Sequence, residues 1–195
     1  DSSQDVTLGG SVAAKAGKVL DNVDIDAGRN VTLSGSVEAG TITIDAGTSI
    51  SKDGGITGDA ETRLIASTGN ISLTTGDFGG NIMLTDATLT APASNAEVQL
   101  SALGGHIQQV QGTASDGAVS VTLASGLITA DKVVAEADNG ISLNTATAIV
   151  DLGVNGSGNI DLTNQGALTL LDVQANDGTI SVTSSGRLTA TDRKS

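Results

Sequence analysis

The feature that most constrains this chain is a short apolar–polar–apolar triplet that returns about every twenty residues along most of its length. Side chains alternate between the two faces of a strand, so the first and third residues of a triplet share one face. From the first triplet to the last there are eight steps, counting one gap that Leu64 fills. The triplets of this first series begin at Val23, Ile42, Ile82, Val98, Val119, Ile141, Ile160 and Ile180.

Two further series are interleaved with the first at the same spacing. The second series is Val12, Val31, Ile50, Ile71, Leu89, Ile107, Leu127, Ile149, Leu168 and Leu188. The third and weaker series is Val19, Val37, Ile56, Phe78, Val110, Val133, Val154 and Val173. Three short strands per repeat predict an all-β fold, a right-handed parallel β-helix (β-solenoid) with triangular coils of about 20 residues and roughly ten coils. Residues 1–195 would form a single β-helix segment, a rod about 45 Å long.

The phase of the repeat also assigns individual side chains to the core or the surface. Ile71 would point inward, between Ile50 and Leu89 of the neighbouring coils, whereas Ser72 would point outward. Glycines such as Gly28 fall between the triplets, where corners often require the positive φ that glycine adopts without penalty.

The composition agrees with a narrow core of stacked strands. Apolar residues make up 38% of the chain, but aromatic residues only 1%, which is too few rings for an ordinary globular core. β-branched side chains favour strands because they pack well on a pleated surface. The chain has no cysteine, so disulfide bonds and cysteine-based metal sites are excluded.

The net charge of −13 argues against a nucleic-acid partner, because phosphates attract clustered Lys and Arg. No stretch approaches the roughly 18 apolar residues of a membrane helix, so we expect no membrane insertion. No signal peptide is visible. Neither end carries a recognisable capping signal, and we therefore interpret the chain as a segment excised from a longer repeat-containing protein.

Four stretches of the repeat resemble a known family of bacterial exoproteins. They are Gly69–Leu73, Gly80–Leu84, Gly158–Leu162 and Ile44–Gly47. They are similar to the repeats of filamentous haemagglutinin-type adhesins, which Gram-negative bacteria export by two-partner secretion, and the resemblance covers essentially the whole chain.

The resemblance implies a long β-helical shaft that is secreted or displayed on the bacterial cell surface. It implies two partners for the parent chain, a two-partner-secretion outer-membrane transporter and a host-cell or glycan receptor. Members of the family serve adhesion, biofilm formation or delivery of a C-terminal toxin. The family's amino-terminal secretion domain is not recognisable in this sequence, so the chain would be shaft without the activity-bearing ends.

The residues that could carry chemistry are few. His106 is the only histidine, and no nucleophile motif accompanies it. Asp24 and Asp26 lie on one expected outward strand, and Asp45 follows Asp26 by one repeat, which would stack the two carboxylates on adjacent coils. Stacked acids can recruit Ca²⁺, but the next coil supplies no third acid.

Asp53 and Asp59 form the second Ca²⁺ candidate, within one expected loop. Glycan cleavage needs a carboxylate pair, usually with sugar-stacking aromatics, and this chain has a single aromatic residue. We therefore predict that the protein is not an enzyme and has no catalytic, cofactor-binding or metal-binding residues and no cofactor.

Two functions of different class remain. The first is a non-catalytic structural shaft segment of a large secreted or surface-exposed bacterial adhesin. The alternative is a glycan- or receptor-binding β-helix module that uses one face of the solenoid. Exposed loops with aromatic or Arg anchors would favour the second function, and the sequence shows neither.

Overall fold

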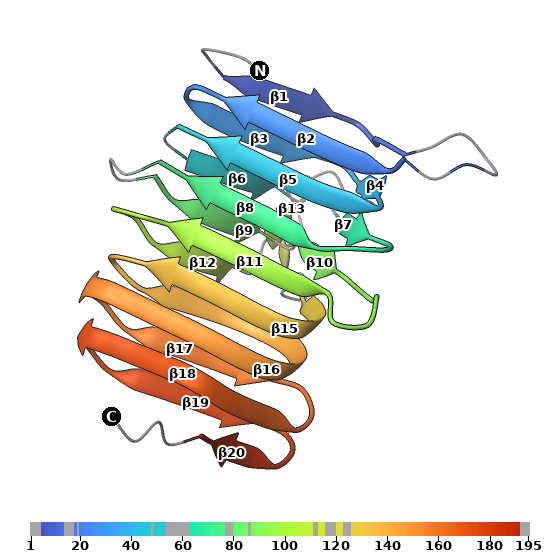
Figure 1. Cartoon of the computed structure of the whole chain (residues 1–195). Helices are drawn as coiled ribbons and strands as arrows, with labels where there is room; N and C mark the ends of the chain where they lie inside the picture. Colours follow the sequence, from blue (N-terminus) through green and yellow to red (C-terminus); the bar gives the residue numbers. More distant parts are fainter. Residues whose placement is uncertain are drawn as a thin grey trace.

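We analysed a computed structural model, which describes residues 5–13, 18, 20–47, 49–53, 63–76, 80–85, 87–110, 113–115, 120–122 and 126–191. The secondary-structure elements of these residues are all β-strands. An 18-stranded sheet with only parallel pairings is curled nearly closed, with its strands stacked one above another (Figure 1). The all-β class and the parallel pairing predicted from the triplets are therefore confirmed.

Strand pairing divides the sheet into three rows, each running along the stack. Row 1 consists of β2 (Asn22–Ala27), β5 (Thr41–Ala46), β8 (Ile71–Thr75), β11 (Glu97–Ala102), the end of β15 (Ile128–Ala137), the end of β16 (Ile141–Ser157), β18 (Leu168–Asp177) and β20 (Leu188–Ala190). Row 2 consists of β1 (Val6–Gly9), β3 (Asn30–Ser34), β6 (Ser49–Asp53), β9 (Ile82–Thr85), β12 (Ile107–Val110), the start of β16, β17 (Ile160–Asn164) and β19 (Ile180–Ser184).

Row 3 is built from shorter pieces. It begins with a parallel bridge between Val12 and Val37. It continues through β4 (Val37–Ala39), β7 (Arg63–Ala66), β10 (Thr88–Thr90), the start of β15, the middle of β16 and the end of β17. The long strands β15 and β16 turn from one row into the next, and they join the three rows into one sheet.

The step between neighbouring strands of a row is not constant, and this corrects the predicted period. In row 2 the step from Val31 to Ile50 is short, but the steps from Ile50 to Ile82 and from Ile107 to Ile141 are each more than half as long again. The described part of row 2 consequently contains eight strands, where a constant period predicted roughly ten coils. The longest step includes an antiparallel pair outside the sheet, formed by β13 (Thr113–Ser115) and β14 (Ser120–Thr122).

Variable steps also mean that the predicted series cross between rows. Val23 pairs with Ile42 as predicted, but the next partner of Ile42 is Ile71. Ile82, predicted for the same series as Ile42, instead pairs with Ile50 in row 2. Every triplet has the same inward–outward pattern, so its side chains fit any of the three rows. The row that a triplet joins therefore depends on the length of the connection that precedes it.

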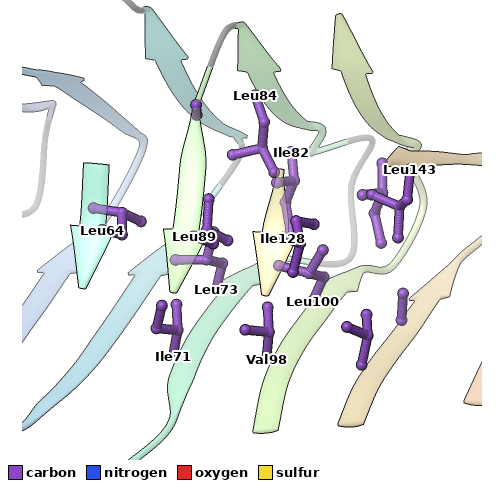
Figure 2. Close-up of a cluster of buried hydrophobic side chains, with 14 of the residues drawn as sticks. Leu64, Ile71, Leu73, Ile82, Leu84, Leu89, Val98, Leu100, Ile128 and Leu143 are labelled. Atoms are coloured by element: carbon purple, nitrogen blue, oxygen red, sulfur yellow. The ribbon is translucent and has the colours of Figure 1, made fainter. Parts of the chain in front are cut away.

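The core is one continuous column of aliphatic side chains enclosed by the three rows. Figure 2 shows its middle, to which row 1 contributes Ile71, row 2 contributes Ile82 and row 3 contributes Leu89. All three side chains are fully buried. Buried members of the middle strands include Leu64, Ala66, Ile71, Leu73, Ile82, Leu84, Leu89, Val98, Leu100, Ile107 and Ile128.

Asparagines before the strands form a contact that the sequence did not predict. Asn70 Oδ1 accepts a hydrogen bond from the backbone N–H of Glu97 at 2.9 Å, one strand further along row 1. Asn159 Oδ1 accepts one from the backbone N–H of Thr179 at 3.0 Å in row 2. The amide groups thus tie successive strands of the stack together at the corners, where the backbone ladder is interrupted.

Glycine at one corner is required by the close approach of the strands. A methyl group on Gly47 would collide with the carbonyl oxygen of Gly28. Gly28 occupies the same position one circuit earlier, where a circuit is the length of chain between neighbouring strands of one row. We expect Gly47→Ala to lower the free energy of unfolding by about 1–3 kcal/mol, because the backbone must shift. Gly153→Ala is the matched control, since its methyl would meet only Glu136 Cγ at 3.8 Å.

Urea unfolding of both glycine variants measures this difference. The control should change stability by no more than about 0.5 kcal/mol. Equal losses in the two variants would show that the Gly47 corner does not limit the approach of the strands.

Candidate functional site

Three open grooves lie on the surface of the described residues. One groove lies at the corner between rows 1 and 2 and includes Asp26 and Asp45. A second lies on the outer face of row 1 around Gln99. The third is a notch on row 2 whose lining includes Gly140 and the single histidine, His106.

The predicted stacking of Asp26 on Asp45 is confirmed. The two residues are register partners on β2 and β5, both side chains are exposed, and they border a groove of about 380 Å³. The next residue along this line is Thr74, so the row supplies no third acid there. Two exposed carboxylates with a hydroxyl form an open, incomplete oxygen set for a cation such as Ca²⁺.

The outer face of row 1 carries most of the acidic groups near this groove. Its two outward lines are Asp24, Thr43, Ser72, Gln99, Val134 and Asp151, and Asp26, Asp45, Thr74, Ser101, Glu136 and Gly153. Lys132 forms ion pairs with two acidic side chains of this face: its Nζ lies 3.8 Å from Glu97 Oε1 and 3.8 Å from Asp151 Oδ2. The sequence did not predict this ion-paired lysine, because Glu97 and Lys132 are separated by a long circuit and a constant period does not bring them together.

The notch on row 2 includes Gly140, which lies just before β16. This residue has φ +129°. The notch also includes His106, which precedes β12, and Asn159, which precedes β17. The notch has a volume of about 290 Å³. Its other lining residues are Ile107, Gln108, Asn139, Ile141, Ser142 and Asp161.

Some polar side chains of the notch are hydrogen-bonded to other described residues, and others are not. Asn139 Nδ2 donates to the carbonyl of Gly104 at 3.1 Å, and Asn159 Oδ1 is occupied by Thr179. The side chains that make no hydrogen bond or ion pair with other described residues are His106, Gln108, Ser142 and Asp161. An imidazole, an amide, a hydroxyl and a carboxylate thus line one open hollow.

His106 lies at the corner between β11 and β12 and is partly exposed. Its side chain is half-buried against the notch, and its backbone N–H donates to Asn81 Oδ1 at 3.0 Å. The sequence could not reveal the notch, because its walls come from strands whose first residues, Ile107 and Ile141, are joined by the longest step of row 2.

The remaining metal candidate falls partly outside the described residues. Asp59 lies there, and the structure describes only the backbone of Asp53, at the end of β6. Among the described residues, no three His, Cys, Asp or Glu side chains gather closely enough to hold a metal ion.

One exposed ion pair fastens the first strand to the second strand of row 2. Arg29 Nη2 lies 2.6 Å from Asp5 Oδ2, and Arg29 Nε donates to Asp5 Oδ1 at 3.2 Å. The backbone N–H and side-chain amide of Asn30 donate to the same carboxylate at 3.1 and 2.9 Å. The hydrogen bond from Arg29 lowers the pKa of Asp5, and the bonds from Asn30 act in the same direction.

A lowered pKa means that this contact stabilises the folded state above the ordinary aspartate pKa and is lost as pH falls through the folded value. We expect NMR titration of the Asp5 carboxyl carbon to give a midpoint below 3.8. Arg29→Gln should return the midpoint towards that value. A midpoint that is at or above 3.8 in both proteins would contradict the contact.

Comparison with known proteins adds no relative: no family model, curated protein or solved structure matches this chain. None of the described residues forms a helix with the length and hydropathy that crossing a membrane requires.

Proposed function

We propose that the chain is a structural shaft segment of a large secreted or surface-exposed bacterial adhesin, and that it is not catalytic. In this proposal the curled sheet is a right-handed parallel β-helix, and residues 1–195 are one segment of it. The exported parent chain would use a two-partner-secretion outer-membrane transporter and would meet a host-cell or glycan receptor. The family, the cell-surface location and these partners rest on the resemblance of the repeats.

The observation that supports the shaft is the continuous register of row 2. In row 2, each inward residue pairs with the next from Val6 through Val31 to Ile180, and a single aliphatic column fills the interior. Small polar side chains cover much of the outside, and the grooves between them are open. Such a structure holds its two ends at a fixed separation, which is the task of a shaft.

A distance measurement between the ends of row 2 tests this role. Thr7 and Ser181 are both exposed, occupy the same outward position, and are seven strand steps apart. At the spacing of neighbouring strands, the Cα atoms should be about 34 Å apart. The chain has no cysteine, so Thr7→Cys with Ser181→Cys accepts two spin labels at defined positions.

Pulsed electron spin resonance should give one narrow distance distribution near this separation once the label linkers are included. The distribution should be unchanged between low and moderate denaturant, until cooperative unfolding begins. A broad distribution in buffer would contradict a rigid shaft.

The notch at Gly140 favours a second candidate, a glycan-binding module that uses the face of row 2. Sugars present hydroxyl groups that both donate and accept hydrogen bonds. The amide of Gln108, the hydroxyl of Ser142 and the carboxylate of Asp161 can form hydrogen bonds with such groups. The notch is open to solvent and its polar groups are not held by one another. We therefore place this function second to the shaft.

A glycan array separates the two functions. The shaft proposal expects no glycan to bind above background. The alternative expects a defined set of glycans, lost when Gln108→Ala and Asp161→Ala are combined and retained in Ser181→Ala, which lies on the same outward line beyond the notch. Binding that survives the double substitution would place any glycan site elsewhere.

A further inference from the structure

Two asparagines of the stack are each followed directly by glycine: Asn139 precedes Gly140, and Asn155 precedes Gly156. Such a pair can react with itself, because the backbone nitrogen of the glycine can attack the amide carbon of the asparagine. Glycine has no side chain to shield that nitrogen, and its backbone reaches the required geometry readily. Folded structure slows the reaction wherever it holds the two groups apart, so the surroundings of each pair decide which asparagine reacts.

The first pair is held by hydrogen bonds on both sides. Asn139 Nδ2 donates to the carbonyl of Gly104 at 3.1 Å, and the backbone N–H of Asn139 donates to the carbonyl of Gly105 at 2.8 Å. The carbonyl of Gly140 accepts a bond from the backbone N–H of Ile107 at 3.0 Å. The side chain of Asn139 and the backbone around it are therefore fixed, although Asn139 is an exposed residue.

The second pair lies at an irregularity of the sheet, near the end of β16. Between the register partners of Val154 and of Ser157, β16 holds two residues where β18 holds one. Such a β-bulge interrupts the ladder of the strand that contains it. Asn155 is exposed, and its side chain makes no hydrogen bond or ion pair with another described residue. Nothing in the described part of the chain thus holds its amide away from the backbone nitrogen of Gly156.

We propose that Asn155 is a site of spontaneous modification, at which the side-chain amide becomes a carboxylate in the folded protein. The nitrogen of Gly156 loses its proton to solvent and forms a bond to Cγ of Asn155. The bond from Cγ to Nδ2 breaks, and ammonia leaves with a proton taken from solvent. Water then opens the cyclic imide at either of its carbonyl groups, which gives aspartate or isoaspartate. Water is the co-reactant, and no atom is oxidised or reduced.

The modification would change the charge and the main chain at the end of β16. The product carries a new negative charge in a region that includes Asp138, whose carbonyl lies against Gly156, and Asp177, the register partner of Ser157. Isoaspartate also lengthens the main chain, which a bulge accommodates more easily than a regular ladder does. Because the ammonia is lost to solvent, the converted fraction grows with the age of the protein.

Comparison of folded and unfolded protein tests the proposal. Both samples are incubated in mildly alkaline buffer, one of them in concentrated urea, until the unfolded sample has largely converted. In the folded protein, Asn155 should convert at least about tenfold faster than Asn139, because the held pair must first open locally. In urea the two rates should agree within about threefold, because neither pair is then held.

A protease that cleaves before aspartate separates the two sites for mass spectrometry. Cleavage before Asp138, Asp151 and Asp161 places Asn139 and Asn155 on different peptides. The mass of each peptide gives its converted fraction, and incubation in water enriched in heavy oxygen marks conversion that occurred before proteolysis. A new cleavage before residue 155 identifies aspartate, whereas a converted peptide that resists this cleavage contains isoaspartate.

Asn155→Gln is the matched variant, because the longer side chain forms a larger ring far more slowly. It should abolish conversion at this position in the folded protein, whereas Asn139→Gln should leave the rate at Asn155 unchanged. Gly156 is kept in both variants, since a methyl group there would lie 2.6 Å from the carbonyl oxygen of Asp138. Circular dichroism shows whether each variant folds.

The folded wild-type protein alone decides the outcome. Conversion of Asn139 as fast as that of Asn155, or faster, overturns the proposal. Protection of both asparagines in the folded protein, while both convert in urea, also overturns it. None of these results bears on the shaft, which the distance between the spin labels tests separately.

Discussion

Ile71→Asp is expected to lower the free energy of unfolding by more than about 3 kcal/mol, a large part of the stability of a typical domain. Ile71 is fully buried and stacks between Ile42 and Val98 of row 1. The surrounding column is aliphatic, so a carboxylate there would have neither water nor a cation. It would either remain charged at high cost or bind a proton at a raised pKa.

Ser72→Asp is the matched control, because it introduces the same side chain one residue later on the same strand. Ser72 lies on the outer face of row 1, between Thr43 and Gln99, and we expect stability to change by no more than about 0.5 kcal/mol. Urea unfolding of the two variants at neutral pH gives both values. Similar losses in both would mean that the inward phase of β8 is wrong.

Hydrogen exchange of the Ile71→Asp protein shows which strands lose amide protection. Each strand of a row touches mainly its two neighbours, so protection should fall first in β5, β8 and β11. Amides of β17 should keep more of their protection in partly destabilised protein. Uniform loss along the chain would indicate that the whole stack unfolds as one unit.

The inward phase of a strand could be predicted from the sequence, but its neighbours in the stack could not. Ile71 shows the difference: it is buried as predicted, yet it lies between Ile42 and Val98 rather than between Ile50 and Leu89. Alternation along a strand is a local property that three residues reveal. The partner one circuit away depends on the length of every connection between, and the longest step of row 2 is nearly twice the shortest.

The same reason explains which surface features could be predicted. Asp26 and Asp45 are separated by one short circuit that matches the predicted period, and their stacking was predicted correctly. The notch at Gly140 combines residues from circuits of different length, and Lys132 meets Glu97 across a long one. Contacts between residues one short circuit apart can be predicted from the sequence, whereas contacts across the long circuits can be identified only in the structure.

The second large effect is expected at a polar group inside the core. Asn164 ends β17 and is 1% exposed, in a position that aliphatic residues such as Leu89 and Ile128 occupy earlier in row 3. Its Oδ1 accepts a hydrogen bond from Thr145 Oγ1 at 2.8 Å and another from the backbone N–H of Thr147 at 3.0 Å. Both donors are also buried.

Asn164→Ala should therefore cost about 2–4 kcal/mol, because two buried donors lose their acceptor at the same time. Thr163→Ala, at the exposed neighbouring position, should change stability by no more than about 0.5 kcal/mol. Urea unfolding measures both.

A double-mutant cycle then separates the hydrogen bond from the loss of packing. Thr145→Val removes the hydroxyl donor while keeping the volume of the side chain. It should cost clearly less in the Asn164→Ala protein than in the parent, because there the hydroxyl has already lost its acceptor. A coupling above about 0.5 kcal/mol is expected for two residues in direct contact. Additive losses would show that the hydrogen bond between Thr145 and Asn164 does not contribute to stability.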